Sequence, residues 1–305
     1  MTTHRDFYDF LVRLVPNVNG RTYIRAYKSE WVEYEDQNGN KKKRSEQKFQ
    51  HQVGVLEADN RVKMGKKFLE KFPLLANRVW YFLNNQLVDE ATYFAEVRQA
   101  ESDNPHRPLR IGYVLFEGFE TLDLMGPVEM WNFVPNVEGH FVSQHGGLIT
   151  SAQHFRTETI PWQVGRYDIV LVPGGPGTRT LVNDGDYLNA LSTLLEATPQ
   201  VLTVCTGSAL VAKTGLLDGH RATSNKRAWD WVMAQSDRVH WEPSARWVAD
   251  RKFVSSSGVS AGMDMTLAVI AQLTDLATAE AIAARTEYQW NRDPENDPFA
   301  VNKVD

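Results

Sequence analysis

The chain contains one cysteine, Cys205, at a point where an apolar strand pattern gives way to a helical one. The strand-like run is Val201–Val204, and small residues typical of a helix start follow the sulfur. Such a corner exposes a side chain at the carboxyl edge of a sheet, as the nucleophile elbow of many α/β enzymes does. The positive end of the helix is expected to favour thiolate over thiol. The alternative is a buried structural cysteine, because free cysteine is among the most buried residue types.

The second chemical candidate is Asp123, which lies between Leu122 and Leu124 just after another strand-like run. Partial burial raises the pKa of a carboxyl group, so Asp123 is a candidate proton donor near neutral pH. A helix cap or a surface salt bridge is the structural alternative for this residue.

A glycine-rich turn, Val-Pro-Gly-Gly-Pro-Gly at residues 172–177, ends a further apolar strand. Without side chains, Gly174 and Gly175 would let backbone N–H groups approach a reacting atom, as an oxyanion hole requires. The N–H of Thr206, directly after the cysteine, would complete the hole, and its hydroxyl would contact substrate or cap the helix. An ordinary tight turn is the alternative reading of the glycines.

Composition sets the class of protein. The 305 residues, 42% of them hydrophobic, suffice for one large domain or two of ordinary size. A lone cysteine excludes an intrachain disulfide, which fits a reducing cytosol. No apolar run approaches the roughly 20 residues needed to span a bilayer, and the first residues lack the apolar core of a secretory signal. We therefore expect a cytoplasmic protein with no membrane contact.

No zinc-ligand spacing or phosphate-binding loop is present, so neither a metal nor a cofactor is expected.

The chain divides near residues 99–107, a polar stretch with two prolines that reads as a linker. After it, apolar strand-like runs alternate with helical segments: strands at 109–116, 167–172, 201–204 and 253–256, and helices at 187–198, 208–214, 263–273 and 277–285. This alternation predicts a mostly parallel α/β sandwich at residues 106–305, with ligands at the carboxyl ends of its strands.

Residues 1–105 predict a small α+β module whose role the sequence does not assign. Alternating segments at 22–27 and 30–35, followed by an Asn-Gly turn within 36–40, indicate a hairpin. Residues 66–84 have the apolar spacing of an amphipathic helix, which Pro73 must break or kink. The basic run Lys41–Arg44 is read as a solvated hairpin flank, with phosphate contact as the lesser alternative. The whole chain carries a net charge of −5, whereas residues 1–105 carry 17 Lys and Arg against 15 Asp and Glu. Nucleic acid is therefore not an expected partner, with residues 1–105 as a weak alternative.

Five motifs in order carry a family resemblance: Leu122–Pro127, Val172–Gly177, Val204–Ser208, Thr214–Thr223 and Ser257–Asp264. Together they resemble the ThiJ/PfpI superfamily (class I glutamine amidotransferase-like), and within it the isonitrile hydratase-like branch, over residues 108–300. The resemblance implies a flavodoxin-like sandwich, usually a homodimer, with the cysteine on a nucleophile elbow. It assigns the reactive pair to Cys205 and Thr206 and the acidic partner to Asp123.

One motif departs from the branch, whose members typically read Ala-Thr-Thr-His-Trp where this chain reads Ala222-Thr-Ser-Asn-Lys-Arg-Ala-Trp229. Asn225 replaces the imidazole. An amide can orient water or hydrogen-bond a substrate, but it cannot exchange a proton near pH 7.

The leading hypothesis is a cysteine-dependent lyase that hydrates a small isonitrile to an N-substituted formamide. The second hypothesis is a non-catalytic ligand or oxidation sensor, because the same fold serves as the effector-binding half of some transcription regulators. The third is a glyoxalase or deglycase acting on small dicarbonyls, also through Cys205.

Overall fold

The computed structural model describes residues 11–301, apart from residues 17, 18, 20, 36–40, 77, 85, 102, 103, 105 and 106. The chain forms two compact units, residues 1–97 and residues 98–305, which are described separately. Among the described residues, no helix combines the length and the apolar character needed to cross a membrane.

The carboxyl-terminal unit is built on an eight-stranded sheet in the order β15-β16-β12-β11-β7-β8-β10-β9. The strands are β7 (Leu109–Val114), β8 (Val137–Ser143), β9 (Gly147–Thr150), β10 (Arg156–Pro161), β11 (Ile169–Val172), β12 (Gln200–Val204), β15 (Trp247–Asp250) and β16 (Phe253–Ser256). Neighbouring strands from β16 to β10 run parallel, while β15 and β9 pair antiparallel at the two edges. The predicted mostly parallel α/β sheet is confirmed.

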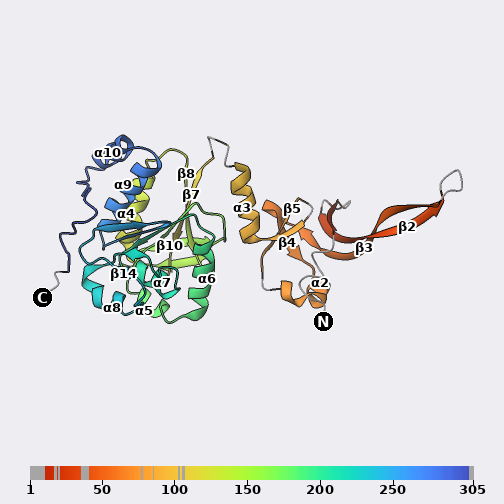
Figure 1. The fold of residues 1–305 in the computed structure, drawn as a ribbon, viewed down its shortest axis with the longest axis horizontal. Coiled ribbons are helices and arrows are strands. Elements are labelled where there is room, and N and C mark those ends of the chain that lie inside the picture. The colour runs from red at the N-terminus through yellow and green to blue at the C-terminus, as the bar shows by residue number, and fades with distance from the viewer. Residues whose placement is uncertain are drawn as a thin grey trace. The chain divides into compact units, whose positions relative to one another are not determined.

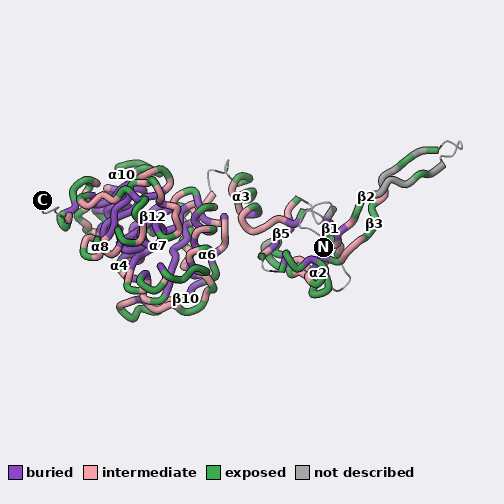
Figure 2. The backbone as a smooth tube through the Cα atoms, turned by 60° about the horizontal axis from the view of Figure 1, so that its bottom comes forward, coloured by how far each residue is buried: buried purple, intermediate pink, exposed green. Residues whose placement is uncertain are grey.

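Helices cover both faces of this sheet (Figure 1). One face carries α4 (Thr121–Trp131), α9 (Ala261–Leu273) and α10 (Leu276–Arg285), and the other carries α6 (Gly185–Glu196) and α7 (Gly207–Lys213). The short elements α5 (Thr178–Leu181), η3 (Lys226–Ala228), α8 (Trp229–Met233) and the strand pair β13 (Arg221–Ala222) and β14 (His240–Trp241) complete the unit. Figure 2 shows the buried residues concentrated along the central strands, and all four residues of β11 are buried. This is the flavodoxin-like sandwich that the sequence predicted.

The amino-terminal unit is a six-stranded antiparallel sheet in the order β1 to β6. Its elements are β1 (Leu11–Pro16), β2 (Thr22–Glu35), β3 (Lys41–Leu56), η1 (Ala58–Asn60), β4 (Arg61–Met64), α2 (Lys66–Lys71), η2 (Pro73–Leu75), β5 (Trp80–Leu83), β6 (Gln86–Asp89) and the start of α3 (Glu90–Glu101). The two segments predicted at 22–27 and 30–35 form one continuous strand, β2. The predicted tight turn at 36–40 lies outside the described residues.

The helix predicted over residues 66–84 is wrong beyond its first turns. Helix α2 ends at Lys71, and residues 80–83 form strand β5 instead. The cause is Pro73, which restricts the residue before it, and Phe72 accordingly has φ −125° and ψ 67°. Several apolar residues of this range are buried, as an amphipathic pattern predicts, but they do not lie on one helix. Phe68, Phe72 and Trp80 belong to the hydrophobic core of this unit.

The basic run lies on β3 opposite acidic residues of β2. Lys41 is in register with Glu35 and Lys43 with Glu33, and the Lys43 and Glu33 side chains form an ion pair at 3.2 Å with both groups exposed. This pairing agrees with the solvated-flank interpretation.

The predicted linker at 99–107 is wrong at its start, because α3 continues to Glu101. Residues 102, 103, 105 and 106 of that segment lie outside the described residues. Glu101 and Arg110 form an ion pair at 2.7 Å, which ties the end of α3 to β7.

Candidate active site

Cys205 occupies the corner between the end of β12 and the start of α7, with a positive φ of 57°. A positive φ is uncommon for a residue with a side chain and marks local backbone strain. The corner is held by its backbone: the Cys205 carbonyl accepts hydrogen bonds from the hydroxyls of Ser208, at 3.1 Å, and Ser224, at 2.8 Å. The geometry is that of the nucleophile elbow predicted for this position.

Asp123 lies in the first turn of α4 and is fully buried. The Gly174 N–H donates to its Oδ2 at 2.9 Å, whereas Oδ1 has no hydrogen-bond partner in the part of the chain that the structure describes. Burial raises the pKa of Asp123 to about 8, the charge of Glu120 acts in the same direction, and the Gly174 hydrogen bond opposes them. At neutral pH the carboxyl group therefore holds its proton.

The expectation of a resting thiolate at Cys205 is wrong. The residue is 6% exposed, and burial is the largest influence on its thiol, whose pKa it raises. The Asp123 charge also raises this pKa, while the Thr206 N–H and the Asn225 amide lower it. Burial outweighs the Thr206 and Asn225 hydrogen bonds that lower the pKa of the thiol, so the pKa values of sulfur and carboxyl are both raised and their neutral forms are favoured. The two groups are close enough that each shifts the pKa of the other.

Asn225 contacts the sulfur directly. Its Nδ2 donates to the Cys205 Sγ at 3.1 Å, and its Oδ1 accepts from the Ala228 N–H at 3.1 Å. The second bond fixes which end of the amide faces the sulfur, because only the NH₂ end is then left for it. Asn225 is thus a positioned donor at the place where the resembling branch has an imidazole.

The glycine-rich turn does not have the form expected of an oxyanion hole. The N–H of Gly174 is taken by Asp123, and the N–H of Gly175 donates to the Thr206 Oγ1 at 3.0 Å. Both groups hold the site together and are not free to bind an oxyanion. Gly174 is nevertheless needed as glycine, since a Cβ there would lie 2.5 Å from the Thr206 nitrogen. The structure brings all six predicted residues together, and it leaves Thr206 and Asn225 as the donors that reach the sulfur.

A cavity of about 320 Å³ opens beside the sulfur. Its walls include Cys205, Thr206 and Asn225 together with residues that sequence reasoning missed: Glu120, Arg179, Arg227, Ala228 and Val259. The Arg179 guanidinium stacks on the Trp231 ring at 3.6 Å, which positions one cationic group beside the cavity. A further residue that the sequence did not single out is the buried Thr178, whose hydroxyl donates to the Gly175 carbonyl at 2.7 Å and the Thr206 hydroxyl at 3.2 Å.

Curated proteins similar to this chain include an enzyme and a regulator. The isonitrile hydratase of Pseudomonas putida is 29% identical over 187 residues, which cover 59% of this chain and 78% of that enzyme. The HTH-type transcriptional regulator GbdR of Pseudomonas aeruginosa is 26% identical over 204 residues, which cover 62% of this chain and 53% of the regulator.

Solved structures give the same fold. A ThiJ/PfpI family protein from Pseudomonas syringae superposes with a TM-score of 0.56 at 25% identity, covering 63% of this chain and 80% of that one. DJ-1beta of Drosophila melanogaster superposes with a TM-score of 0.51 at 14% identity, covering 60% of this chain and all of that one. The model of the DJ-1/PfpI family matches residues 110–272, more than half of the chain. The chain therefore belongs to the DJ-1/PfpI family.

Proposed function

We propose that this protein is a cysteine-dependent hydratase that converts a small isonitrile into an N-substituted formamide. The observation that carries the proposal is the fully buried carboxyl group of Asp123 beside the Cys205 sulfur, at the edge of a cavity of about 320 Å³. Burial raises the pKa of this carboxyl group to about 8, which favours its protonated form at neutral pH. An isonitrile carbon is weakly basic and becomes electrophilic once it is protonated. A site with one proton donor and one sulfur nucleophile in contact matches both properties.

The first step adds the thiol across the isonitrile carbon. Asp123 gives its proton to that carbon, the sulfur forms the new C–S bond, and the thiol proton passes to the Asp123 carboxylate. The result is a thioimidate, R–N=CH–S–Cys205, with the carboxyl group again protonated. This relay starts from a neutral pair, so it does not need the resting thiolate that the sequence had suggested.

The second step is hydrolysis of the thioimidate. Water adds across the C=N bond, so the carbon gains a hydroxyl group and the nitrogen gains a hydrogen. The C–S bond then breaks, the hydroxyl proton passes to the sulfur, and the formamide R–NH–CHO leaves. The Thr206 N–H and the Asn225 amide, which both reach the sulfur, would stabilise the charge that develops on it as the bond breaks.

The proposal is tested by incubating the protein with benzyl isonitrile and following N-benzylformamide by NMR, with methylglyoxal and lactate as a parallel assay. We expect formamide formation by the parent and none above background by Cys205→Ala. Mass spectrometry of the quenched reaction should show a Cys205 peptide heavier by one isonitrile. Full turnover by Cys205→Ala, or lactate without formamide, would refute the scheme.

A second candidate function is ligand sensing without catalysis, favoured by the similarity to the regulator GbdR. In that case the cavity beside Cys205 would bind a small effector. An oxidation sensor would form a stable sulfenic or sulfinic acid at Cys205 after mild peroxide, which mass spectrometry detects. The raised pKa of the buried thiol argues for slow oxidation, because the thiolate is the reactive form.

We also propose that the protein acts as a homodimer, as its family resemblance implies. Two exposed apolar side chains support this: Leu122, 43% exposed, and Phe299, 68% exposed, line one cavity together with Asn225. Light scattering during gel filtration should give twice the chain mass, and a monomer at tens of micromolar would overturn this part.

A further inference from the structure

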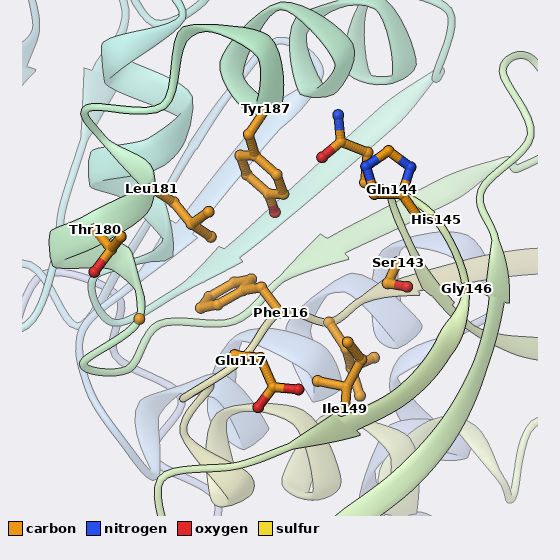
Figure 3. Close-up of a pocket in the computed structure, with 12 residues that line it drawn as sticks. Phe116, Glu117, Ser143, Gln144, His145, Gly146, Ile149, Thr180, Leu181 and Tyr187 are labelled. Carbon is orange, nitrogen blue, oxygen red and sulfur yellow. The ribbon is translucent and has the colours of Figure 1, made fainter.

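A second cavity, of about 310 Å³, lies elsewhere in the carboxyl-terminal unit (Figure 3). Its lining residues follow the end of β7, lie at the end of β8 and in β9, and come from α5 and the first turn of α6. Its walls are mostly apolar: Leu115, Phe116, Ile149, Leu181 and the ring of Tyr187. Its polar residues are Glu117, Ser143, Gln144, His145 and Thr180.

This cavity is separate from the one at Cys205, and the two share no lining residue. The segment from Gly175 to Leu181 divides them. Gly175, Pro176 and Arg179 face the cysteine cavity, whereas Gly177, Thr180 and Leu181 face the second one. The second cavity is therefore not an extension of the candidate active site.

Tyr187 provides the observation that points to a ligand. The side chain is 4% exposed, and its hydroxyl has no hydrogen-bond partner among the residues that the structure describes. Figure 3 shows the ring reaching from α6 into the space between Leu181, Phe116 and Gln144. Burial raises the pKa of this phenol, so it stays a neutral O–H donor. A buried hydroxyl without a partner costs folding free energy, and a bound acceptor would recover it.

The charge of the cavity restricts what it can hold. Glu117 is the only Asp, Glu, Lys or Arg among the described residues that line it. One of its oxygens accepts from the Thr150 N–H at 3.2 Å, which holds the carboxylate at the cavity. A carboxylate repels anions and favours a hydrogen-bond donor on the ligand.

We propose that this cavity binds a small uncharged aromatic amide. The amide carbonyl accepts from the Tyr187 O–H, the amide N–H donates to Glu117, and the aromatic ring packs against Phe116, Ile149 and Leu181. The buried Tyr187 hydroxyl then gains an acceptor and the Glu117 carboxylate gains a donor, while the apolar walls bury the apolar part of the ligand.

The test is isothermal titration calorimetry of the full-length protein with 2-phenylacetamide and with phenylacetate, which has the same shape but is an anion. We expect saturable binding of the amide only. Tyr187→Phe removes a single oxygen that has no partner, so the variant should be at least as stable as the parent and should bind the amide about tenfold more weakly. Glu117→Gln, at an exposed side chain, should weaken binding several-fold.

Two further outcomes decide the location of the ligand. Cys205→Ala should bind the amide as the parent does, and Tyr187→Phe should keep the parental reactivity of Cys205. Equal binding of amide and carboxylate, unchanged affinity in Tyr187→Phe, or loss of binding in Cys205→Ala would each overturn the proposal. None of these results depends on whether the protein hydrates isonitriles.

Discussion

The side-chain amide of Asn225 donates to the sulfur of Cys205 over 3.1 Å, and its orientation is set by the Ala228 N–H on its other side. On the side of Asn225 the sulfur therefore faces a fixed hydrogen-bond donor, where the resembling branch has an imidazole that could act as a base. Since this donor lowers the pKa of a thiol that burial raises, the Asn225 contact adjusts how much thiolate the site contains.

Gly258→Ala should weaken that contact. A Cβ at Gly258 would lie 2.1 Å from the Asn225 Nδ2 and 3.0 Å from the Cys205 Sγ, so the amide must move. A lost hydrogen bond to a charged group is worth about 1.5–3 kcal/mol, and we expect alkylation of Cys205 by iodoacetamide to slow at least about tenfold. Mass spectrometry at fixed times gives the rate.

The matched control is Gly185→Ala, where an added Cβ meets nothing within 4 Å. It should leave the alkylation rate unchanged, and Asn225→Ala should reproduce the loss seen in Gly258→Ala. Parental reactivity in Asn225→Ala would show that the amide does not tune the thiol.

The proposed proton donor predicts a pH profile for turnover. Asp123 has a pKa of about 8 and must be protonated to act as an acid, so kcat/KM should hold below pH 8 and fall above it. Asp123→Asn should lower turnover by about 10²–10⁴-fold and abolish that alkaline limb. Initial rates of formamide formation from pH 6 to 10 check both statements, and an alkaline limb that persists in Asp123→Asn would assign it to another group.

The same carboxyl group predicts a pH dependence of stability. Its pKa is raised from 3.8 to about 8 in the folded state, so between those values the folded protein binds a proton that the unfolded chain has lost. The free energy of unfolding should therefore fall as pH rises, by about 1.4 kcal/mol per unit, until pH 8 is passed. Asp123→Asn lacks this loss. Between pH 5 and pH 8 the free energy of unfolding of the parent, measured in urea, should fall by about 4 kcal/mol more than that of Asp123→Asn. An equal change in the two proteins would contradict the raised pKa of Asp123 in the folded state.

Much of the carboxyl-terminal fold could be predicted because the central strands of its sheet, β11, β12 and β16, are almost fully buried. The predicted strand at 253–256 is β16 as observed, and that at 201–204 differs from β12 by one residue. Strands β8, β9 and β10 escaped prediction because they lie toward one edge of the sheet and are half exposed, so they lack a continuous apolar run. The helix predicted at 66–84 was wrong although its apolar spacing fits a helix. The apolar residues of this range belong in part to a short helix, α2, and in part to a strand, β5.

The predicted site residues come together because β11, β12 and β7 are adjacent parallel strands whose carboxyl ends meet at one edge. The sequence could not predict the protonation state of the Cys205 thiol or the hydrogen-bond partners of the glycine-rich turn. The helix start after Cys205 was visible in the pattern, but the surroundings that raise the pKa of its thiol include residues distant in sequence, such as Asp123. The partners of the Gly174 and Gly175 N–H groups were equally hidden, because they lie on α4 and at the start of α7.

The Thr206 hydroxyl connects the start of α7 to the glycine-rich turn. The Oγ1 of Thr206 accepts from the Gly175 N–H at 3.0 Å and from the Thr178 hydroxyl at 3.2 Å. Thr206→Val keeps the shape of the side chain but leaves the Gly175 N–H without an acceptor, which should cost about 1–3 kcal/mol in urea unfolding. Thr206→Ser keeps the oxygen and is the control, with a cost below about 1 kcal/mol for the lost methyl group.

The neighbouring Gly174 N–H lowers the pKa of Asp123, so loosening of the turn in Thr206→Val should also move the alkaline limb of turnover to higher pH, while Thr206→Ser leaves it in place. If Val and Ser variants unfold alike and share one pH profile, the Thr206 hydroxyl does not hold this turn.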